Sequence, residues 1–267
     1  MPELPEVETI RRALEPALVG RTIVEAGAFA SAKFSDARLA DGATIAAVQR
    51  RGKYLIMPLD TASELIVHLG MTGVLRHVAQ LTTDDTYLRA WWRLDDHRVF
   101  EFSDVRRFGR IAVVPAGEYA ALPTLAALGP EPFSDAFDAR TFHRALNRSN
   151  RAIKTQLLSQ RPVAGIGNIY ADEACWMARV RPSARTISQP AATRLHDAIR
   201  EVLADAINRK GTTLRDYRTV DGGYGENQHH LLAYGRFGYP CQRCGTPLRR
   251  SVIDTRTTTH CPKCQRR

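Results

Sequence analysis

Long hydrophobic runs are absent from this sequence. Apolar runs are confined to short segments such as Leu65-Ile66-Val67, whereas a helix that crosses a membrane needs about 18 or more apolar residues in succession. The first residues, MPELPEVE, turn acidic at the third position and contain no apolar core, unlike a secretory signal peptide. Internal repeats and low-complexity tracts are also lacking. We therefore expect a globular cytoplasmic protein, in a compartment where thiols stay reduced.

The charge of the chain is unevenly distributed. The 267 residues, 44% of them hydrophobic and 25% charged, are enough for one large or two modest domains. Residues 1–135 hold 15 basic against 18 acidic residues, a net charge of −3, whereas residues 136–267 hold 23 against 10, a net charge of +13. Charge alone is also compatible with a merely solubilising surface. A surplus confined to one half indicates a polyanionic partner.

The first half of the chain predicts a helix followed by short strands. Leu4, Val7 and Leu14 recur at helical spacing, and Pro5 suits an early helical position. Residues 2 and 3 are therefore expected at the tip of a packed helix. Strands separated by polar or glycine-containing turns follow, which is typical of a β-sandwich. The predicted strands are Thr22–Phe29, Thr44–Arg50, Tyr54–Pro58, Leu65–Leu69, Val74–Val78, Leu88–Leu94, Val99–Phe102 and Arg110–Val114.

The second half predicts helices. After a Pro- and Ala-rich linker, two helices at 152–160 and 169–178 flank a glycine-containing turn, a unit often used on DNA backbones. A longer helix at 193–209 ends at Gly211. Residues 212–235 are polar and glycine-rich, so we expect a mobile loop. The four expected parts are residues 1–115, a linker at 116–135, a helical part at 136–235 and a terminal part at 236–267.

Four cysteines in two pairs form the strongest physical signal. Cys241 and Cys244 are separated by two residues, as are Cys261 and Cys264, and 16 residues lie between the pairs. A β-hairpin would bring the pairs together so that four thiolates surround one Zn²⁺ tetrahedrally. Two disulfides are the alternative, which a cytosolic location disfavours. A four-thiolate site leaves no position for water, so we expect this zinc to be structural.

The cysteine-containing segment is strongly basic. It has one acidic residue, Asp254, against seven basic ones: Arg243, Arg249, Arg250, Arg256, Lys263, Arg266 and Arg267. A rigid hairpin with this charge suits binding to a phosphate backbone. Zinc ribbons also bind RNA or protein, so the ribbon alone does not establish DNA binding.

Residues 2 and 3 suggest covalent chemistry. Removal of Met1 would leave Pro2 as a terminal secondary amine, and α-amino groups titrate near ~8, so part of it is nucleophilic at neutral pH. Attack on a sugar C1′ would give an iminium ion that acidifies the adjacent carbon. Glu3 could transfer the proton that accompanies ring opening. By itself this dipeptide is more simply explained as a helix start.

Five segments, in order, resemble the family of formamidopyrimidine-DNA glycosylase and endonuclease VIII. They are MPELPEVETIRR, HLGMTG at 68–73, DVRRFG at 104–109, GIGNIYADE at 165–173 and the four-cysteine ribbon. The resemblance covers the whole chain. It implies an α+β fold, in which a helix-capped β-sandwich precedes a helix–two-turn–helix domain with a zinc-finger hairpin. It also implies that DNA binds between these parts.

The resemblance also assigns roles to single residues. It implies that Pro2 is the nucleophile and Glu3 the ring-opening acid. It also implies that Lys53 contacts DNA and assists base removal or elimination, and that Arg256 grips phosphates beside the extruded nucleotide and takes part in the second elimination. Asn168 and Lys154 would contact the same backbone, and Glu6 matches a family carboxylate for which a mainly structural role is the alternative. Met71, Arg106 and Phe108 would fill the gap left by an extruded base, offsetting an unstacking cost of a few kcal/mol.

The chain departs from the family pattern at three positions. Val105 stands where the family usually has proline, which could loosen the loop that carries Arg106. Tyr87 stands where a backbone-contacting histidine is common, and Asn150 where a lysine is common. These two residues are nevertheless predicted to lie near DNA.

We therefore expect a monomeric zinc-containing DNA glycosylase and AP lyase that acts on double-stranded DNA with oxidised bases or abasic sites. It would excise oxidised purines and cleave the strand by β,δ-elimination. PELPEV at the start and the set of Met71, Arg106 and Phe108 favour purines over the oxidised pyrimidines of endonuclease VIII-like enzymes. A non-catalytic zinc-ribbon protein that binds DNA is the other alternative, against which Pro2, Glu3 and Lys53 argue.

Overall fold

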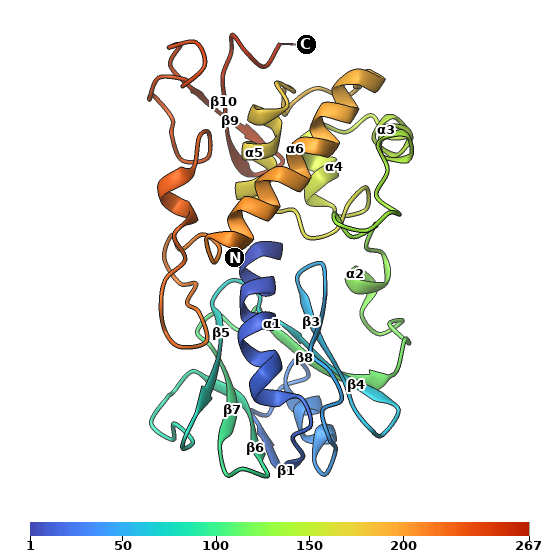
Figure 1. Ribbon diagram of the computed structural model, residues 1–267, viewed down its shortest axis with the longest axis vertical. Helices are drawn as coiled ribbons and strands as arrows, with labels where there is room; N and C mark the ends of the chain where they lie inside the picture. Colours follow the sequence, from blue (N-terminus) through green and yellow to red (C-terminus); the bar gives the residue numbers. More distant parts are fainter. Residues whose placement is uncertain (267) are drawn as a thin grey trace. The chain divides into compact units, whose positions relative to one another are not determined.

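The computed structural model describes residues 1–266 and divides into two compact units. The first contains residues 1–126 and 209–226, and the second contains residues 127–208 and the described residues from 227 onward. Figure 1 shows the elements of each unit. Within the described residues, no helix is long and apolar enough to span a membrane.

Helix α1 (Leu4–Leu18) opens the first unit. Its residues Leu4, Val7, Ile10, Leu14 and Leu18 are buried, which confirms the helical spacing in the sequence. Burying this face packs the helix against the sandwich core, where Val7, Ile10, Leu14 and Leu18 join the same apolar cluster as the strands. The tip that carries residues 2 and 3 is therefore attached to a fixed support.

The predicted β-sandwich consists of two antiparallel four-stranded sheets (Figure 1). One has the order β1-β6-β7-β5, with β1 (Ile23–Ala28), β6 (Leu88–Leu94), β7 (Val99–Asp104) and β5 (Gly73–Val78). The other has the order β2-β3-β4-β8, with β2 (Gln49–Arg51), β3 (Tyr54–Pro58), β4 (Ser63–His68) and β8 (Arg110–Pro115). Buried Trp92 and Phe100 stack in the core with ring centroids 4.9 Å apart. The Trp92 indole N–H donates to Ala37 in the 3-10 helix η1 (Ser35–Ala40).

The prediction of one strand over Thr44–Arg50 is wrong. Only Gln49 and Arg50 of that range lie in a strand, and earlier residues form isolated bridges, Thr44 with Thr22 and Ile45 with Leu59. Thr22 precedes β1 of one sheet and Leu59 follows β3 of the other. The segment therefore changes partners between the sheets, which its sequence does not reveal.

The second unit is mainly helical, as predicted. After the short α2 (Pro123–Ala126) of the first unit come α3 (Ala139–Asn147), α4 (Ile153–Leu158), α5 (Asn168–Met177) and α6 (Gln189–Asn208). Asp138 caps α3 by accepting the N–H groups of Arg140 and Thr141. The 3-10 helix η2 (Asn227–His230) and the hairpin of β9 (Arg249–Ile253) and β10 (Arg256–His260) complete the unit.

Residues 209–226 pack with the first unit, whereas the sequence placed them with the helical part. Tyr217 is buried in the apolar cluster of the sandwich and α1, and its hydroxyl donates to the Lys210 carbonyl at 3.1 Å. This packing brings together residues that are far apart in the sequence, so local sequence patterns do not predict it. One aromatic side chain anchors an otherwise polar segment.

We expect Tyr217→Ala to lower the free energy of unfolding by about 3 kcal/mol, because removing a buried aromatic side chain leaves a cavity in the core. Leu214→Ala is the control, since Leu214 lies in the same segment but is half-exposed; its effect should stay within about 0.5 kcal/mol. Denaturant unfolding of the full chain measures both. Equal midpoints for the two variants would show that the segment does not belong to this core.

Candidate functional site

The tip of α1 is held by a buried carboxylate. Pro2, Glu3 and Glu6 are all buried. One oxygen of Glu6 accepts the Glu3 N–H at 2.7 Å, and the other accepts the Thr212 N–H at 2.7 Å. Glycine is required at Gly211, because its φ is +80° and a side chain there would clash with the Glu6 carboxylate. Glu6 thus fixes the backbone of the predicted catalytic residues and the start of segment 212–234 together.

Lys53 is positioned by the hairpin between β2 and β3. It is buried and lies directly before β3. Arg50 in the same hairpin donates to Glu8 of α1 at 3.1 Å and to the Gly52 carbonyl at 3.0 Å. Burial acts to raise the pKa of Glu8, but hydrogen bonds from Arg11 and Arg12 outweigh it and keep the pKa below its ordinary value. The ionised Glu8 therefore ties the hairpin that carries Lys53 to α1.

His68 lies close to Lys53 and had no role in the sequence analysis. Its ring lies 4.7 Å, between centroids, from that of Tyr54, the residue after Lys53. Burial, together with the positive charge of Lys53, lowers the pKa of His68 to about 4. The imidazole is therefore neutral at neutral pH, and its ring adds no competing positive charge beside Lys53.

The loop at residues 104–109 is organised by Asp104, a residue the sequence analysis did not single out. Asp104 is fully buried. Its Oδ1 accepts the Thr72 hydroxyl at 2.5 Å and the Arg106 N–H at 3.2 Å, and its Oδ2 accepts the Gly109 N–H at 2.7 Å. The Arg106 N–H also donates to Thr72. These bonds hold the backbone next to Val105, the position where family members usually have proline.

The predicted gap-filling residues lie on this loop and its neighbour. Arg106 and Phe108 are exposed, Met71 is partly exposed, and the Arg106 guanidinium lies 4.7 Å from the centroid of the Phe108 ring. The two loops approach closely at Gly70, where φ is +63° and a side chain would strike the Phe108 backbone. A cation and an apolar wedge are thus presented together on a supported surface. Tyr87, which is also exposed, has its ring centroid 6.0 Å from the Arg89 guanidinium.

Lys154 does not present its charge to solvent as the predicted phosphate contact requires. Its side chain is fully buried, and Nζ lies 2.6 Å from Asp172 Oδ1. Nζ also donates to the Thr257 carbonyl and the Thr258 hydroxyl, both at 3.0 Å. The second Asp172 oxygen accepts the Thr259 N–H at 2.9 Å. We therefore interpret Lys154 and Asp172 as a brace that joins α4 and α5 to β10.

The brace supports Arg256, which begins β10 and is exposed. Asp254 and Thr255 in the turn before it have φ of +45° and +66°, and the Thr155 hydroxyl of α4 donates to Asp254 at 2.5 Å. Asn168, at the start of α5, donates to the Thr257 carbonyl at 3.3 Å, while its buried Oδ1 has no hydrogen-bond partner among the described residues. Asn150 is exposed and lies just before α4 in the chain.

The four cysteines converge on one point. Their sulfurs all lie within 4.8 Å of one another, and those of Cys244 and Cys261 are 3.6 Å apart. Sulfurs around a tetrahedral zinc, each ~2.3 Å from the ion, would be about 3.8 Å apart. The Cys264 N–H donates to Cys261 Sγ at 3.3 Å. The arrangement fits a structural Zn²⁺ held by Cys241, Cys244, Cys261 and Cys264, whose binding would stabilise the hairpin.

The thiols differ in acidity without a metal. Hydrogen bonds from Thr246 lower the pKa of Cys244 to about 6, whereas burial and the neighbouring thiols raise the pKa of Cys264 to about 12. A bound dication removes this conflict, because it stabilises all four thiolates. The fifth cysteine, Cys175, is separate: burial raises its pKa to about 12, as expected for an inert core thiol.

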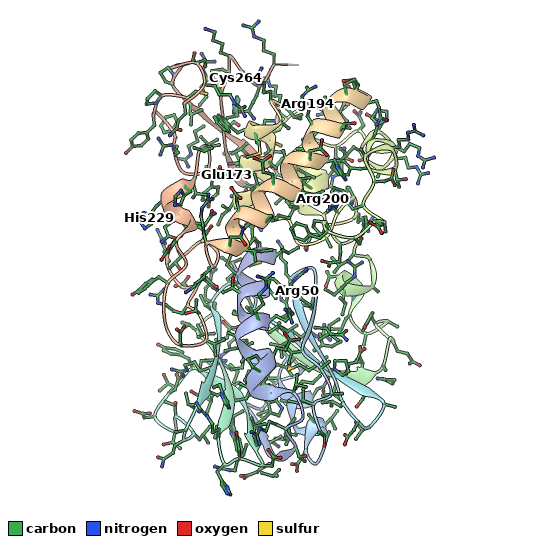
Figure 2. All side chains as sticks on the ribbon, viewed as in Figure 1. Arg50, Glu173, Arg194, Arg200, His229 and Cys264 are labelled. Atoms are coloured by element: carbon green, nitrogen blue, oxygen red, sulfur yellow. The ribbon has the colours of Figure 1, made fainter. Side chains whose placement is uncertain are left out.

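Glu173, which is labelled in Figure 2, lies next to Asp172 on α5 and holds the end of segment 212–234. The side chain is buried, and its carboxylate accepts the N–H groups of Leu232, Ala233 and Tyr234 at 2.9, 2.9 and 2.7 Å. The zinc knuckle is attached nearby, since Arg243 donates to the carbonyls of Trp176 and Met177 at the end of α5. Helix α5 therefore supports both the hairpin and this segment.

Comparisons with known proteins agree with this architecture. The family model of the formamidopyrimidine-DNA glycosylase N-terminal domain matches residues 1–111, and that of its H2TH domain matches residues 128–218. Formamidopyrimidine-DNA glycosylase of Deinococcus radiodurans is 44% identical over 99% of this chain and 97% of its own length. The Thermus thermophilus protein of the same name is 45% identical over 99% and 98%.

Solved structures agree as well. The crystal structure of the MutM (Fpg) protein from Thermus thermophilus has a TM-score of 0.91 at 45% identity, covering 99% of this chain and 98% of that one. A Lactococcus lactis Fpg mutant in complex with Fapy-dG-containing DNA has a TM-score of 0.90 at 33% identity, covering 100% of both chains.

A helix-capped sandwich, together with a helical unit that carries a four-cysteine hairpin, defines the fold of a zinc-binding DNA glycosylase. The chain belongs to the formamidopyrimidine-DNA glycosylase family. The family resemblance, the α+β fold class and the zinc site predicted from the sequence are confirmed.

Lys154→Met should lower the free energy of unfolding by about 3 kcal/mol, because the buried Asp172 carboxyl then has no cation beside it and must either stay charged without a counter-ion or take up a proton. The double variant Lys154→Met/Asp172→Leu should recover part of this stability, because no buried charge remains. Denaturant unfolding measures each effect. The brace would be contradicted if Lys154→Met left the stability unchanged but made the salt slope of DNA binding shallower by about one unit. Lys154 would then be a phosphate contact, as the sequence predicted.

Cys244→Ser should abolish zinc binding and, with it, most of the affinity for duplex DNA, because the hairpin that carries Arg256 is no longer supported. Metal analysis and a DNA titration test both effects. Cys175→Ala removes a thiol outside the cluster and should keep one zinc per chain. Full DNA affinity in metal-free Cys244→Ser would contradict a role for zinc in holding the hairpin.

Proposed function

We propose that this protein is a bifunctional DNA glycosylase and AP lyase of base excision repair that removes oxidised purines through a covalent bond to Pro2. The observation that carries this proposal is the anchoring of the α1 tip, where buried Pro2 and Glu3 are fixed through both oxygens of Glu6. A nucleophile on a fixed helix tip reacts from a defined position, which lowers the entropic cost of attack.

The proposed reaction begins once Met1 has been removed, because the Pro2 nitrogen is otherwise an amide. The free amine attacks C1′ of an extruded nucleotide. The base leaves with the electron pair of the glycosidic bond and takes up a proton, while the amine nitrogen loses its own. Glu3 donates a proton to the ring oxygen as the sugar opens, which gives an iminium ion. The iminium acidifies C2′, so removal of that proton expels the 3′ phosphate, and a second elimination expels the 5′ phosphate.

Other residues would prepare the DNA for this reaction. Lys53, beside the neutral imidazole of His68, would contact DNA and assist base removal or elimination. Met71, Arg106 and Phe108 would occupy the space of the extruded base, which offsets part of the unstacking cost. Arg256 and Asn168, held near each other by the β10 contacts described above, would bind phosphates beside the extruded nucleotide.

The purine preference is supported by the relatives, which are named formamidopyrimidine-DNA glycosylase, and by local chemistry. Segment 212–234 supplies hydroxyls and backbone amides, and an amide donor could bind the O6 edge of a purine. The residue expected to select the opposite base is Arg106, because an orphaned cytosine offers carbonyl and ring-nitrogen acceptors.

Double-stranded DNA as the partner is supported by the similar solved structures, which contain DNA with a lesion or an abasic site. The relatives are bacterial, and we infer that the protein acts as a cytoplasmic monomer on chromosomal DNA.

Borohydride should trap the protein covalently on a duplex containing 8-oxoguanine, and peptide mapping should place the adduct on residue 2. The reductant converts the proposed iminium into a stable amine, so trapping reports the intermediate itself. A protein with an uncleaved N-terminal tag is the matched control and should not be trapped. An adduct on Lys53 would overturn the assignment of Pro2.

Arg106→Ala should reduce the preference for 8-oxoguanine opposite cytosine over adenine by roughly tenfold, which corresponds to the ~1–3 kcal/mol of a bidentate base contact. Single-turnover excision from the two duplexes measures it. Arg107→Ala is the control, since this neighbouring arginine is also exposed. Faster removal of thymine glycol or dihydrouracil than of 8-oxoguanine by the unaltered protein would instead favour an endonuclease VIII-like enzyme.

A further inference from the structure

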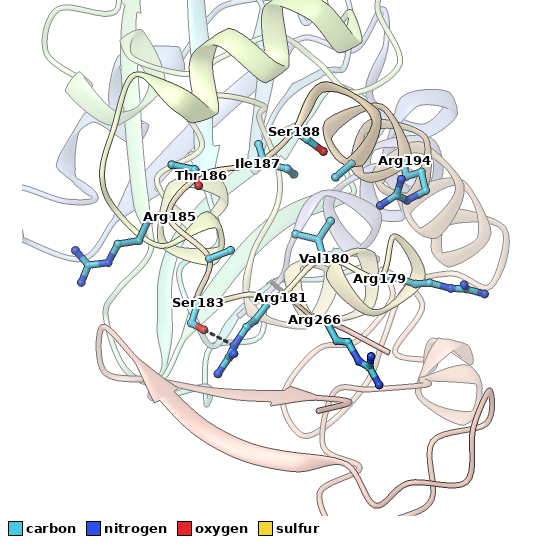
Figure 3. A pocket seen from close by; sticks show the side chains of 12 residues that line it. Arg179, Val180, Arg181, Ser183, Arg185, Thr186, Ile187, Ser188, Arg194 and Arg266 are labelled. Carbon is cyan, nitrogen blue, oxygen red and sulfur yellow. Dashed lines mark hydrogen bonds between the residues drawn. The ribbon is translucent and has the colours of Figure 1, made fainter. Parts of the chain in front are cut away.

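A pocket in the second unit lies outside the residues used above (Figure 3). It has a volume of about 740 Å³ and is formed by segment 179–188, the first turns of α6 and Arg266. Five arginines line it: Arg179, Arg181, Arg185, Arg194 and Arg266. None of its described lining residues is acidic. A hollow of this size with charge of one sign indicates an anionic occupant.

The positive charges of the pocket are not neutralised within residues 1–266. None of the five arginines forms an ion pair there. The hydrogen bonds that three of them donate go to neutral oxygens: Arg181 to the Ser183 hydroxyl at 3.1 Å, Arg194 to the Ala178 carbonyl at 3.2 Å and Arg266 to the Lys263 carbonyl at 3.0 Å. Like charges around one hollow repel one another, so an anion that contacts several of them would be favoured.

The walls of the pocket add to this preference. Helix α6 has 20 residues, and the pocket is lined by Ser188, directly before the helix, and by Ala191 in its first turn. The N-terminal end of a helix carries a partial positive charge and unpaired N–H groups, which favour anions. Val180 and Ile187 are buried in the lining. Figure 3 shows Arg185 on one side of the pocket and Arg179 and Arg194 on the other, so one compact ion would not contact all of them.

We propose that this arginine pocket is a binding site for a polyanion with two or more phosphate groups. Guanidinium groups bind phosphate oxygens through paired N–H donors, and their spread around the pocket suits several phosphates. The phosphates could belong to a nucleic-acid backbone or to a free polyphosphate. Ser183 and Arg185 also line a second hollow of about 410 Å³, whose lining includes Asn150. Asn150 is predicted to lie near DNA. One of the experiments below therefore tests whether DNA phosphates bind in the arginine pocket.

The first experiment measures binding of inorganic pyrophosphate to the full-length protein by calorimetry. The test variant is Arg179→Gln/Arg185→Gln, because neither side chain forms a hydrogen bond or ion pair within the described chain. The control is Arg140→Gln/Arg144→Gln, which removes the same charge from exposed positions on α3 outside the pocket. We expect saturable binding that the test variant weakens at least tenfold and the control less than twofold.

The second experiment distinguishes the two sources of phosphate with an undamaged duplex of about 30 base pairs. If backbone phosphates occupy the pocket, the test variant should make the slope of log K against log salt shallower by about 0.9 for each phosphate that an arginine no longer neutralises. If only free polyphosphates bind, the slope should equal that of the control while the calorimetric difference remains. Either result supports phosphate binding in the pocket and shows whether the phosphates belong to DNA or to a free polyphosphate.

The proposal is overturned if pyrophosphate binding is absent or equally weak in the test and control variants, and the salt slopes of these variants also agree. Thermal unfolding of both variants establishes that they are folded. The proposal does not depend on the proposed function: a protein that fails to excise 8-oxoguanine would defeat that function, while the pyrophosphate measurement would stand unchanged.

Discussion

Buried carboxylates that accept backbone N–H groups fix the functional segments of this protein. Glu6 holds the tip of α1 and Thr212, Asp104 holds the loop of Arg106, Asp172 holds β10, and Glu173 holds residues 232–234. A buried carboxylate left without donors would be costly, so each segment is confined to conformations that satisfy it. Exposed side chains such as Arg106 and Arg256 therefore extend from a backbone that is already in place.

The positions of these carboxylates explain how one short helix supports two functional segments. Asp172 and Glu173 are consecutive on α5, so their side chains leave the helix about 100° apart. One reaches the hairpin and the other reaches the end of segment 212–234. The opposite end of that segment depends on Glu6. Each end of the segment is therefore held by a buried carboxylate.

Local patterns in the sequence predicted the elements but not the contacts between distant residues. The Leu88–Leu94 strand has its predicted bounds, and the spacing of Cys241 and Cys264 with their partners predicted the zinc hairpin, because both depend on neighbouring residues. Lys154 contacts residues more than 100 positions away in the sequence, and Glu6 contacts Thr212, which is 206 positions away. An exposed phosphate-binding lysine and a buried bracing lysine look alike in sequence, so only the structure could distinguish them.

The basic residues fall into two groups: those paired with a carboxylate, which support the fold, and those without such a partner, which are available to bind an anion. Arg50 and Lys154 are paired with Glu8 and Asp172 and have little exposed side-chain surface, so their charges add little to the field outside the protein. Arg256 and the arginines of the pocket face solvent or lie in an open hollow without carboxylate partners among the described residues. Only the second group is available to attract phosphate, because only charges that remain uncompensated can release counterions from a polyanion. The affinity of these arginines for a polyanion should therefore fall steeply with salt.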